Sequence, residues 1–274
     1  MVSVNTNVSA SIALQNLNST NGDLATVQNR LNTGLKVADA RDNGAVFAIA
    51  QGLRADVGAF NAISDSFDRA SSALDVAVSA GTAVSDLLVE LRTLALSAND
   101  ASLDAASRTS LNEDFVSLRD QITSIVTNAD FNGVNLIDGT TANIQILTDV
   151  NASSQITVTG ENLSLGGSLI TLAASADIST QAEASTAIAT LDTNIASVNN
   201  ALARLGTDSR RLELQNTFVT QLVDTLEAGI GNLVDADLAE ESARLQSLQV
   251  RQQLGVQALS IANQSPQIVL SLFR

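Results

Sequence analysis

The stretch that decides the fold is residues 63–95, ISDSFDRASSALDVAVSAGTAVSDLLVELRTLA. Its apolar and small residues recur at alternating spacings of four and three, which is the heptad pattern of a coiled coil. About three or four such repeats are enough to predict a coiled-coil helix, and this stretch exceeds that. The pattern predicts one long helix over 63–98, ending in a polar segment that starts at Ser97. The stripe consists of Ile63, Phe67, Ala70, Leu74, Ala77, Gly81, Val84, Leu88, Leu91 and Ala95.

Two other stretches carry the same spacing. A shorter helix is predicted over 111–129, with Ser107 or Thr109 as its cap and the acids Glu113 and Asp114 near its positive end. It stops at the turn signal Asn132-Gly133. A second long helix is predicted over 188–233. Of its fourteen stripe positions only Ser209 and Asn216 are polar.

The role of these two polar positions stays open at the level of sequence. A buried Asn in a heptad stripe fixes register or partner number in coiled coils. The alternative is that both residues are tolerated near a loosely packed edge. We expect the three stripes themselves to form core within one chain.

The pattern changes between the second and third helices. Residues 143–148 and 155–159 alternate apolar and polar side chains, and Asn151-Ala-Ser-Ser separates them, which predicts a β-hairpin. The glycine-rich stretch to about 175 could add short strands. The patterns together predict a mainly α chain of long antiparallel coiled-coil-like helices, with one small β-hairpin region at about 140–175 and paired N- and C-termini.

The two ends carry stripes of their own. Each terminal helix alone would be marginal in water, because packing supplies most helix stability. Within one chain these stripes have few partners, so we expect them to be buried between subunits. Pro266 is expected to end the last helix. The residues predicted to pack between subunits are Leu14, Leu17, Leu24, Leu31, Leu35, Leu238, Leu245, Leu248, Val256, Leu259, Leu270, Leu272 and Phe273, with Asn21 and Gln28 at intervening heptad positions.

Composition excludes several classes of function. The 274 residues include no Cys, His, Trp or Tyr, so no thiolate or imidazole nucleophile, His general base or soft-ligand zinc site can be built. The net charge of −15 disfavours nucleic acid. Residues 1–40 are neutral and 235–274 carry −1, so residues 41–234 carry −14. No membrane insertion, cofactor, metal or enzymatic activity is expected, because no apolar run approaches a membrane span and no activated constellation is present.

The acidic run Asp235-Ala-Asp-Leu-Ala-Glu-Glu has two interpretations. It could suggest a cation site, although it lacks the glycine and the ligand spacing of a calcium loop. The favoured interpretation is an acidic first turn that opens the last helix and complements its dipole.

With these segments laid out, the chain resembles a bacterial flagellin. The resemblance rests on residues 4–11 (VNTNVSAS), 30–50 (RLNTGLKVADARDNGAVFAIA), 131–139 (FNGVNLIDG), 203–213 (ARLGTDSRRLE), 235–241 (DADLAEE) and 262–272 (ANQSPQIVLSL). It implies a filament subunit in which 1–40 and 235–274 form an inner tube, while 41–234 form the surrounding shell. Only about 50 residues separate Asn135 from Ile188, so large outer domains are not expected.

The resemblance also implies a route and partners. Flagellins are exported unfolded through the flagellar secretion channel, which would explain why the N-terminus lacks a signal peptide, and their ends order on polymerisation. The expected partners are further copies of the chain, the export apparatus with an export chaperone, and the cap and hook-associated proteins. A hook–filament junction protein and a chaperone-like module that wraps a partner helix are the alternatives, and an enzyme is the least supported one.

Overall fold

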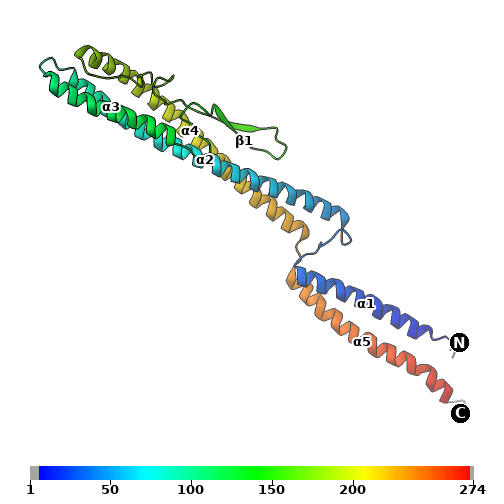
Figure 1. Ribbon diagram of the computed structural model, residues 1–274. Helices are drawn as coiled ribbons and strands as arrows, with labels where there is room; N and C mark the ends of the chain where they lie inside the picture. The colour runs from blue at the N-terminus through cyan, green and yellow to red at the C-terminus, as the bar shows by residue number, and fades with distance from the viewer. Residues whose placement is uncertain (1–5, 272–274) are drawn as a thin grey trace. The chain divides into compact units, whose positions relative to one another are not determined.

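The computed structural model describes residues 6–271, with side chains described for residues 6–264. Within that range the chain forms α1 (Val8–Thr33), α2 (Gly44–Ala98), α3 (Ala105–Asn128), α4 (Gln181–Val234) and α5 (Leu238–Ser271), with strands β1 (Asn143–Leu147) and β2 (Gln155–Thr159). Figure 1 shows that helices dominate and that one two-stranded sheet interrupts them. The prediction of a mainly α fold with one β-hairpin and paired termini is confirmed.

The chain divides into two compact units. The terminal unit contains the residues up to Val57 and from Thr225 onward, and the central unit contains Gly58–Asp224. The long helices α2 and α4 each contribute residues to both units. The expected assignment of 1–40 and 235–274 to an inner tube concerns the assembled filament and stays a prediction.

The central unit has one continuous core built from the three predicted stripes. Phe67, Leu74 and Leu88 of α2 are fully buried, as are Phe115 of α3 and Leu191 of α4. Gly81 in the α2 stripe allows close approach, because a Cβ there would lie 2.8 Å from Leu202 Cδ2. The heptad spacing therefore identified the faces by which α2, α3 and α4 pack together.

Asn216 connects α4 to α2 through both ends of its amide. Its Oδ1 accepts a hydrogen bond from Ser64 Oγ at 2.6 Å, and its Nδ2 donates to Asp68 Oδ1 at 2.7 Å. A shift of one helix along the other would break both bonds. This arrangement favours the register interpretation for Asn216 over a tolerated position at an edge.

Three helices begin earlier than their stripes suggested. Helix α2 starts at Gly44 rather than at 63, because its first turns pack in a separate core around Ala50 and Val234 and so do not continue the stripe of the central unit. Helix α3 starts at Ala105 and is capped by Asp104, whose carboxylate accepts from Ser107 N–H at 3.0 Å. The prediction of Ser107 or Thr109 as the cap is therefore wrong, and Glu113 lies beyond the first turn. Helix α4 opens with a capping box, in which Glu183 accepts from Thr180 N–H at 2.8 Å while Thr180 accepts from Glu183 N–H at 3.2 Å.

The hairpin forms where alternation predicted it. Strands β1 and β2 pair antiparallel, with Ile146 opposite Ile156 and Ile144 opposite Val158. Ile146 and Val158 face the core and are buried. In the described glycine-rich stretch from Gly160 to residue 175, the only β-bridge is an isolated one between Leu165 and Ile170. Arg204 of α4 holds this region by donating to both carboxylate oxygens of buried Glu161 at 2.6 and 2.8 Å.

Helix α5 does not end at Pro266 but continues to Ser271, so that expectation is wrong. The helix lies along α1, and an outside donor reaches the backbone four residues before the proline. Asn7 Nδ2 donates to the carbonyl oxygen of Ala262 at 2.7 Å. Packing against another helix supplies most of the stability of a helix, so a helix paired with α1 can continue past a proline.

Helix α2 meets the length and composition of a membrane span, with a mean hydropathy of 1.4 over eighteen residues, which the sequence analysis did not anticipate. Core helices meet the same criterion. Its heptad stripe lies in the core of the central unit, buried with side chains of α3 and α4. We therefore interpret α2 as a core helix, and the absence of membrane insertion stays a prediction.

Candidate assembly surface

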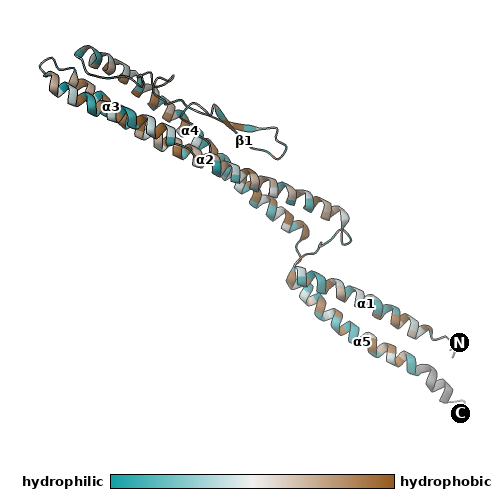
Figure 2. Ribbon diagram, in the orientation of Figure 1, coloured by the Kyte–Doolittle hydropathy of each residue, from teal (hydrophilic) through white to brown (hydrophobic). Residues whose placement is uncertain are grey.

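The terminal unit is built around the antiparallel pair of α1 and α5 (Figure 1). Val27 and Leu248 are its most buried apolar side chains on the two helices. Leu17 packs against Gly255, where a Cβ would lie 3.2 Å from Leu17 Cδ1. Figure 2 shows hydrophobic and hydrophilic residues alternating along both helices, as expected for helices with a covered stripe and polar flanks.

Two side-chain contacts cross the seam of this pair at polar positions. Gln252 Nε2 donates to Asn21 Oδ1 at 2.8 Å, and Arg30 Nη1 donates to Glu241 Oε1 at 2.9 Å. As the position on α1 advances from 21 to 30, the position on α5 falls from 252 to 241, which is the register of antiparallel helices. Asn21 was noted as a polar heptad position, and its partner Gln252 explains why an amide is tolerated there.

The pair is closed at the other end by backbone hydrogen bonds. Gly34 ends α1 in the left-handed conformation, with φ of 72°, and its N–H donates to Arg30 O at 2.8 Å. Ala236 N–H then donates to Gly34 O at 2.9 Å, and Lys36 N–H donates to Val234 O at 2.6 Å. Asp237 accepts from the N–H groups of Ala239 and Glu240, so the acidic run opens α5 as expected.

A second apolar stripe runs along α5 on the side away from α1. Val250, Leu254 and Ile261 remain 55%, 58% and 69% exposed. Residues four and eleven apart return to nearly the same side of an α-helix, so these three form one line. Leu248 and Leu259, which face α1 in the seam, are also eleven residues apart and lie on the opposite side of the helix. Helix α5 therefore has two apolar faces, and α1 covers only one of them.

The structure divides the thirteen residues predicted to pack between subunits. Leu248 is buried within the chain, and six others are half-buried: Leu17, Leu24, Leu31, Leu35, Leu245 and Leu259. Leu14, Leu238 and Val256 are exposed. The side chain of Leu270, and Leu272 and Phe273 altogether, lie outside the described residues. Whether these side chains pack between subunits stays a prediction.

Sequence reasoning missed the outer residues Val8 and Ile12 of α1 and Val250, Leu254 and Ile261 of α5, all of which are exposed. The signal was present as spacings of four and seven that run beside the main stripe. One heptad stripe on each helix already includes most of its leucines, so these spacings do not stand out as a second apolar face.

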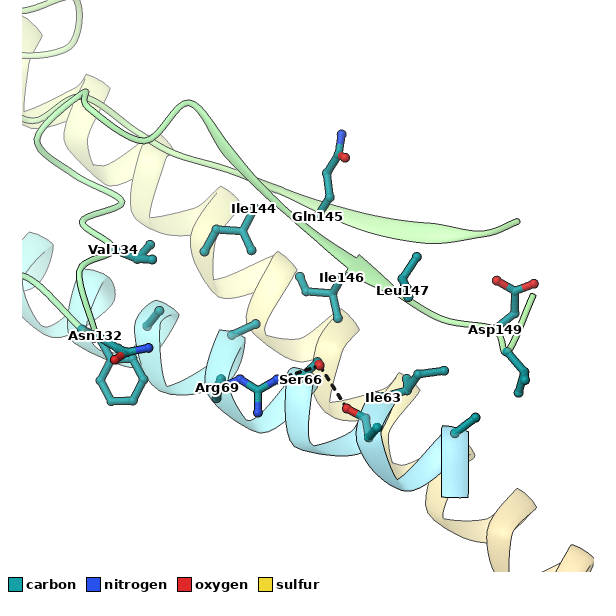
Figure 3. Close-up of a pocket in the computed structure, with 16 residues that line it drawn as sticks. Ile63, Ser66, Arg69, Asn132, Val134, Ile144, Gln145, Ile146, Leu147 and Asp149 are labelled. Atoms are coloured by element: carbon teal, nitrogen blue, oxygen red, sulfur yellow. Dashed lines mark hydrogen bonds between the residues drawn. The ribbon is translucent and has the colours of Figure 1, made fainter. Parts of the chain in front are cut away.

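The central unit also exposes apolar side chains. Leu214 and Phe218 lie one turn apart on α4 and are exposed. A cleft of about 590 Å³ opens between α2 and β1, with Ile63, Val134 and Ile146 among its lining residues (Figure 3). In Figure 3 Arg69 at its edge donates to Ser66 Oγ.

Among the described residues no group of three or more Asp or Glu side chains is arranged to hold a metal ion. The acidic run near Asp235 is accounted for by the cap and first turn of α5. The absence of cofactors and of catalysis stays a prediction.

The chain matches two family models. Residues 4–142 match the bacterial flagellin N-terminal helical region, and residues 188–273 match the bacterial flagellin C-terminal helical region. It is 53% identical to flagellin FljM of Caulobacter vibrioides over 272 residues, covering 99% of this chain and 98% of that protein. It is 37% identical to a flagellin of Brucella melitensis, with both chains fully covered.

Solved structures agree in fold. Flagellin of Bacillus cereus is similar with a TM-score of 0.50 at 26% identity, over 56% of this chain and 88% of that one. A putative flagellar hook-associated protein from Vibrio parahaemolyticus has a TM-score of 0.60 over 71% of this chain and all of that one, but at 15% identity it supports the fold alone. Whole-chain identity therefore favours a filament subunit over a junction protein. Two long helical ends that pair antiparallel, an outer apolar stripe and relatives matched over their full length lead to one conclusion: the chain belongs to the bacterial flagellins, the structural subunits of the flagellar filament.

Proposed function

We propose that the chain polymerises through its terminal unit, with the outer stripe of α5 buried against neighbouring copies. The observation that carries this is the stripe of Val250, Leu254 and Ile261, because its helix already has its other face covered by α1. Long apolar faces left open on a folded protein mark interaction surfaces. In a family of filament subunits the partner is another copy of the chain.

The energetics suit a polymer. Fully burying one Val, Leu or Ile side chain stabilises by about 1.5–3 kcal/mol. Three residues on α5 together with Val8 and Ile12 of α1 would add this apolar burial to the packing of α1 against α5, which already stabilises the terminal helices. Leu14, Leu238 and Val256 from the predicted set are also exposed, but helical spacing places them on another side of their helices, nearer the seam. Leu17, Leu24, Leu31 and Leu248 support the proposed interface by holding the pair together.

Charge supports the proposed arrangement of tube and shell. The ends are nearly neutral and residues 41–234 carry −14. Like charges repel less when they face solvent, because salt screens them over about 8 Å at physiological ionic strength. We therefore propose that 1–40 and 235–274 line the filament interior and that the acidic central segment faces outward.

The family also supports a route and partners that remain proposals for this chain. We infer export through the flagellar apparatus without a cleaved signal peptide, with an export chaperone before assembly and with cap and hook-associated proteins at the filament ends. The intact mass of the protein in sheared filaments tests the first point, since loss of an N-terminal segment would contradict it.

Seeded polymerisation of the purified full chain tests the main proposal. Electron micrographs should show long filaments, and deletion of 255–274 should leave a folded central unit that does not elongate. That deletion removes Ile261 and the contacts of α1 with Gly255 and Ala262, but none of the central core. Filaments formed by the truncated chain, or seeded full chain that stays a small oligomer, would overturn the proposal.

A further inference from the structure

We propose that Asn7 is a positioning residue for the end of α5, where its side-chain amide replaces the backbone donor that Pro266 lacks. The inference rests on the proposed function only in that polymerisation supplies the readout.

The need for a donor follows from the backbone of α5. In an α-helix the N–H of each residue donates to the carbonyl four residues earlier. Proline has no N–H, so the helical bond from position 266 to the carbonyl of Ala262 cannot form. A proline in a helix interior usually kinks or ends the helix, yet α5 is helical to Ser271.

Asn7 supplies the missing bond from outside the helix. Its Nδ2 donates to Ala262 O at 2.7 Å across 255 positions in the chain. At the same time its Oδ1 accepts from Ala10 N–H at 3.0 Å and so caps α1. One amide therefore completes the start of α1 and the backbone of α5 near its end.

Few residue types can do both. The cap requires a short side chain with an acceptor, which Asn, Asp and Ser provide about equally well. The bond to Ala262 requires a donor as well, which Asp lacks when ionised and which the shorter Ser hydroxyl cannot bring as far. Asparagine is the residue that meets both requirements at this position.

The contact also obeys the register of the pair. Asn21 meets Gln252 and Arg30 meets Glu241, and equal steps in opposite directions along the two helices bring position 7 opposite about 264–266, within about one turn of Ala262. The segment that follows Pro266 is apolar in sequence, QIVLSLF. Correct docking of the N-terminal end of α1 is thus coupled to continuation of α5 into this segment.

A double-mutant cycle in the full chain tests the coupling. The variants are Asn7→Ser, which keeps the cap but removes the amide, Pro266→Ala, which restores an N–H at 266, and the two together. In the native background Asn7→Ser should raise the critical concentration of seeded polymerisation by about threefold to tenfold, as expected for one lost hydrogen bond. In the Pro266→Ala background the same change should have an effect below about twofold, since only the cap is altered.

Asn18→Ser serves as the matched control, because Asn18 is exposed on α1, and it should leave the critical concentration unchanged in both backgrounds. An Asn7→Ser effect of equal size in both backgrounds, or no effect in the native one, would refute the inference. Native chain that fails to polymerise would instead overturn the proposed function, before any variant is compared.

Discussion

Arg30 on α1 and Glu241 on α5 form an ion pair of 2.9 Å between residues 211 positions apart in the chain. Glu241 is only 7% exposed, and within the described residues its Oε2 and the Nε of Arg30 have no hydrogen-bond partner. The pair is thus largely desolvated but held by one bond. Removing either partner leaves a buried charge uncompensated, whereas removing both does not.

We expect Arg30→Met to weaken the terminal pair by about 1–3 kcal/mol, less than for a fully buried pair because part of the Arg30 side chain is exposed. Glu241→Met should cost a similar amount, and the double variant less than the sum. Thermal disassembly of filaments measures each. Arg41→Met is the matched control, because Arg41 pairs with Asp39 at an exposed site. Additive effects of the two seam variants would contradict the coupling.

We expect the Asn21–Gln252 contact to fix the register of α1 and α5 while making the pair less stable than an apolar contact would. Asn21→Leu alone leaves the Gln252 amide without its partner and is expected to destabilise filaments by less than about 1 kcal/mol, since both groups are partly exposed. With Gln252→Leu added, two apolar side chains meet in the seam and the disassembly temperature should rise above that of the native chain. A double variant less stable than the native chain would show that the polar contact itself stabilises the pair.

The outer stripe of α5 should control assembly without affecting the central unit. Leu254→Ser and Ile261→Ser are each expected to raise the critical concentration by about tenfold or more, because each removes an apolar side chain from the proposed interface. Sedimentation of seeded samples measures this. The matched control is Gln253→Ser, an exposed polar position on the same helix. If both stripe variants polymerise like the control, the stripe is not an interface.

Acid should weaken the start of α4 through Glu183. Hydrogen bonds from Thr180 lower the pKa of Glu183 below its ordinary value of 4.5, the side-chain bond contributing most. A carboxyl group with a lowered pKa stabilises the fold above its unfolded pKa, and this contribution is lost as the pH falls through the lowered value. Glu183→Gln keeps the capping box but does not ionise.

The thermal unfolding midpoint of the central unit should therefore be higher in the native chain than in Glu183→Gln at neutral pH. The difference should shrink as the pH falls below the ordinary Glu183 pKa of 4.5 and through its lowered pKa. The comparison of the two proteins cancels the contributions of the other acids. A difference that does not depend on pH would contradict the assignment.

The sequence pattern was sufficient to predict a helix or strand wherever buried residues recur with the period of that helix or strand. The stripe from Ile63 to Ala95 faces the core because every third or fourth residue returns to one side of a helix, and alternation over 143–147 and 155–159 identified the hairpin for the same kind of reason. The boundaries were less accurate, since Asp104 and the Thr180–Glu183 box start helices before the first stripe residue. Caps satisfy backbone groups and carry no hydrophobic period.

The sequence by itself determined which faces of the long helices are apolar, where the hairpin lies, that the ends are nearly uncharged, and the family. Only the tertiary structure decided which apolar side chains are already covered, because Leu248 and Leu254 are both leucines of α5 and differ only in the side of the helix that α1 occupies. The tertiary structure also decided that α5 continues past Pro266. A proline removes its own hydrogen bond locally, but whether the helix ends depends on a donor 255 positions away, and no local pattern contains Asn7.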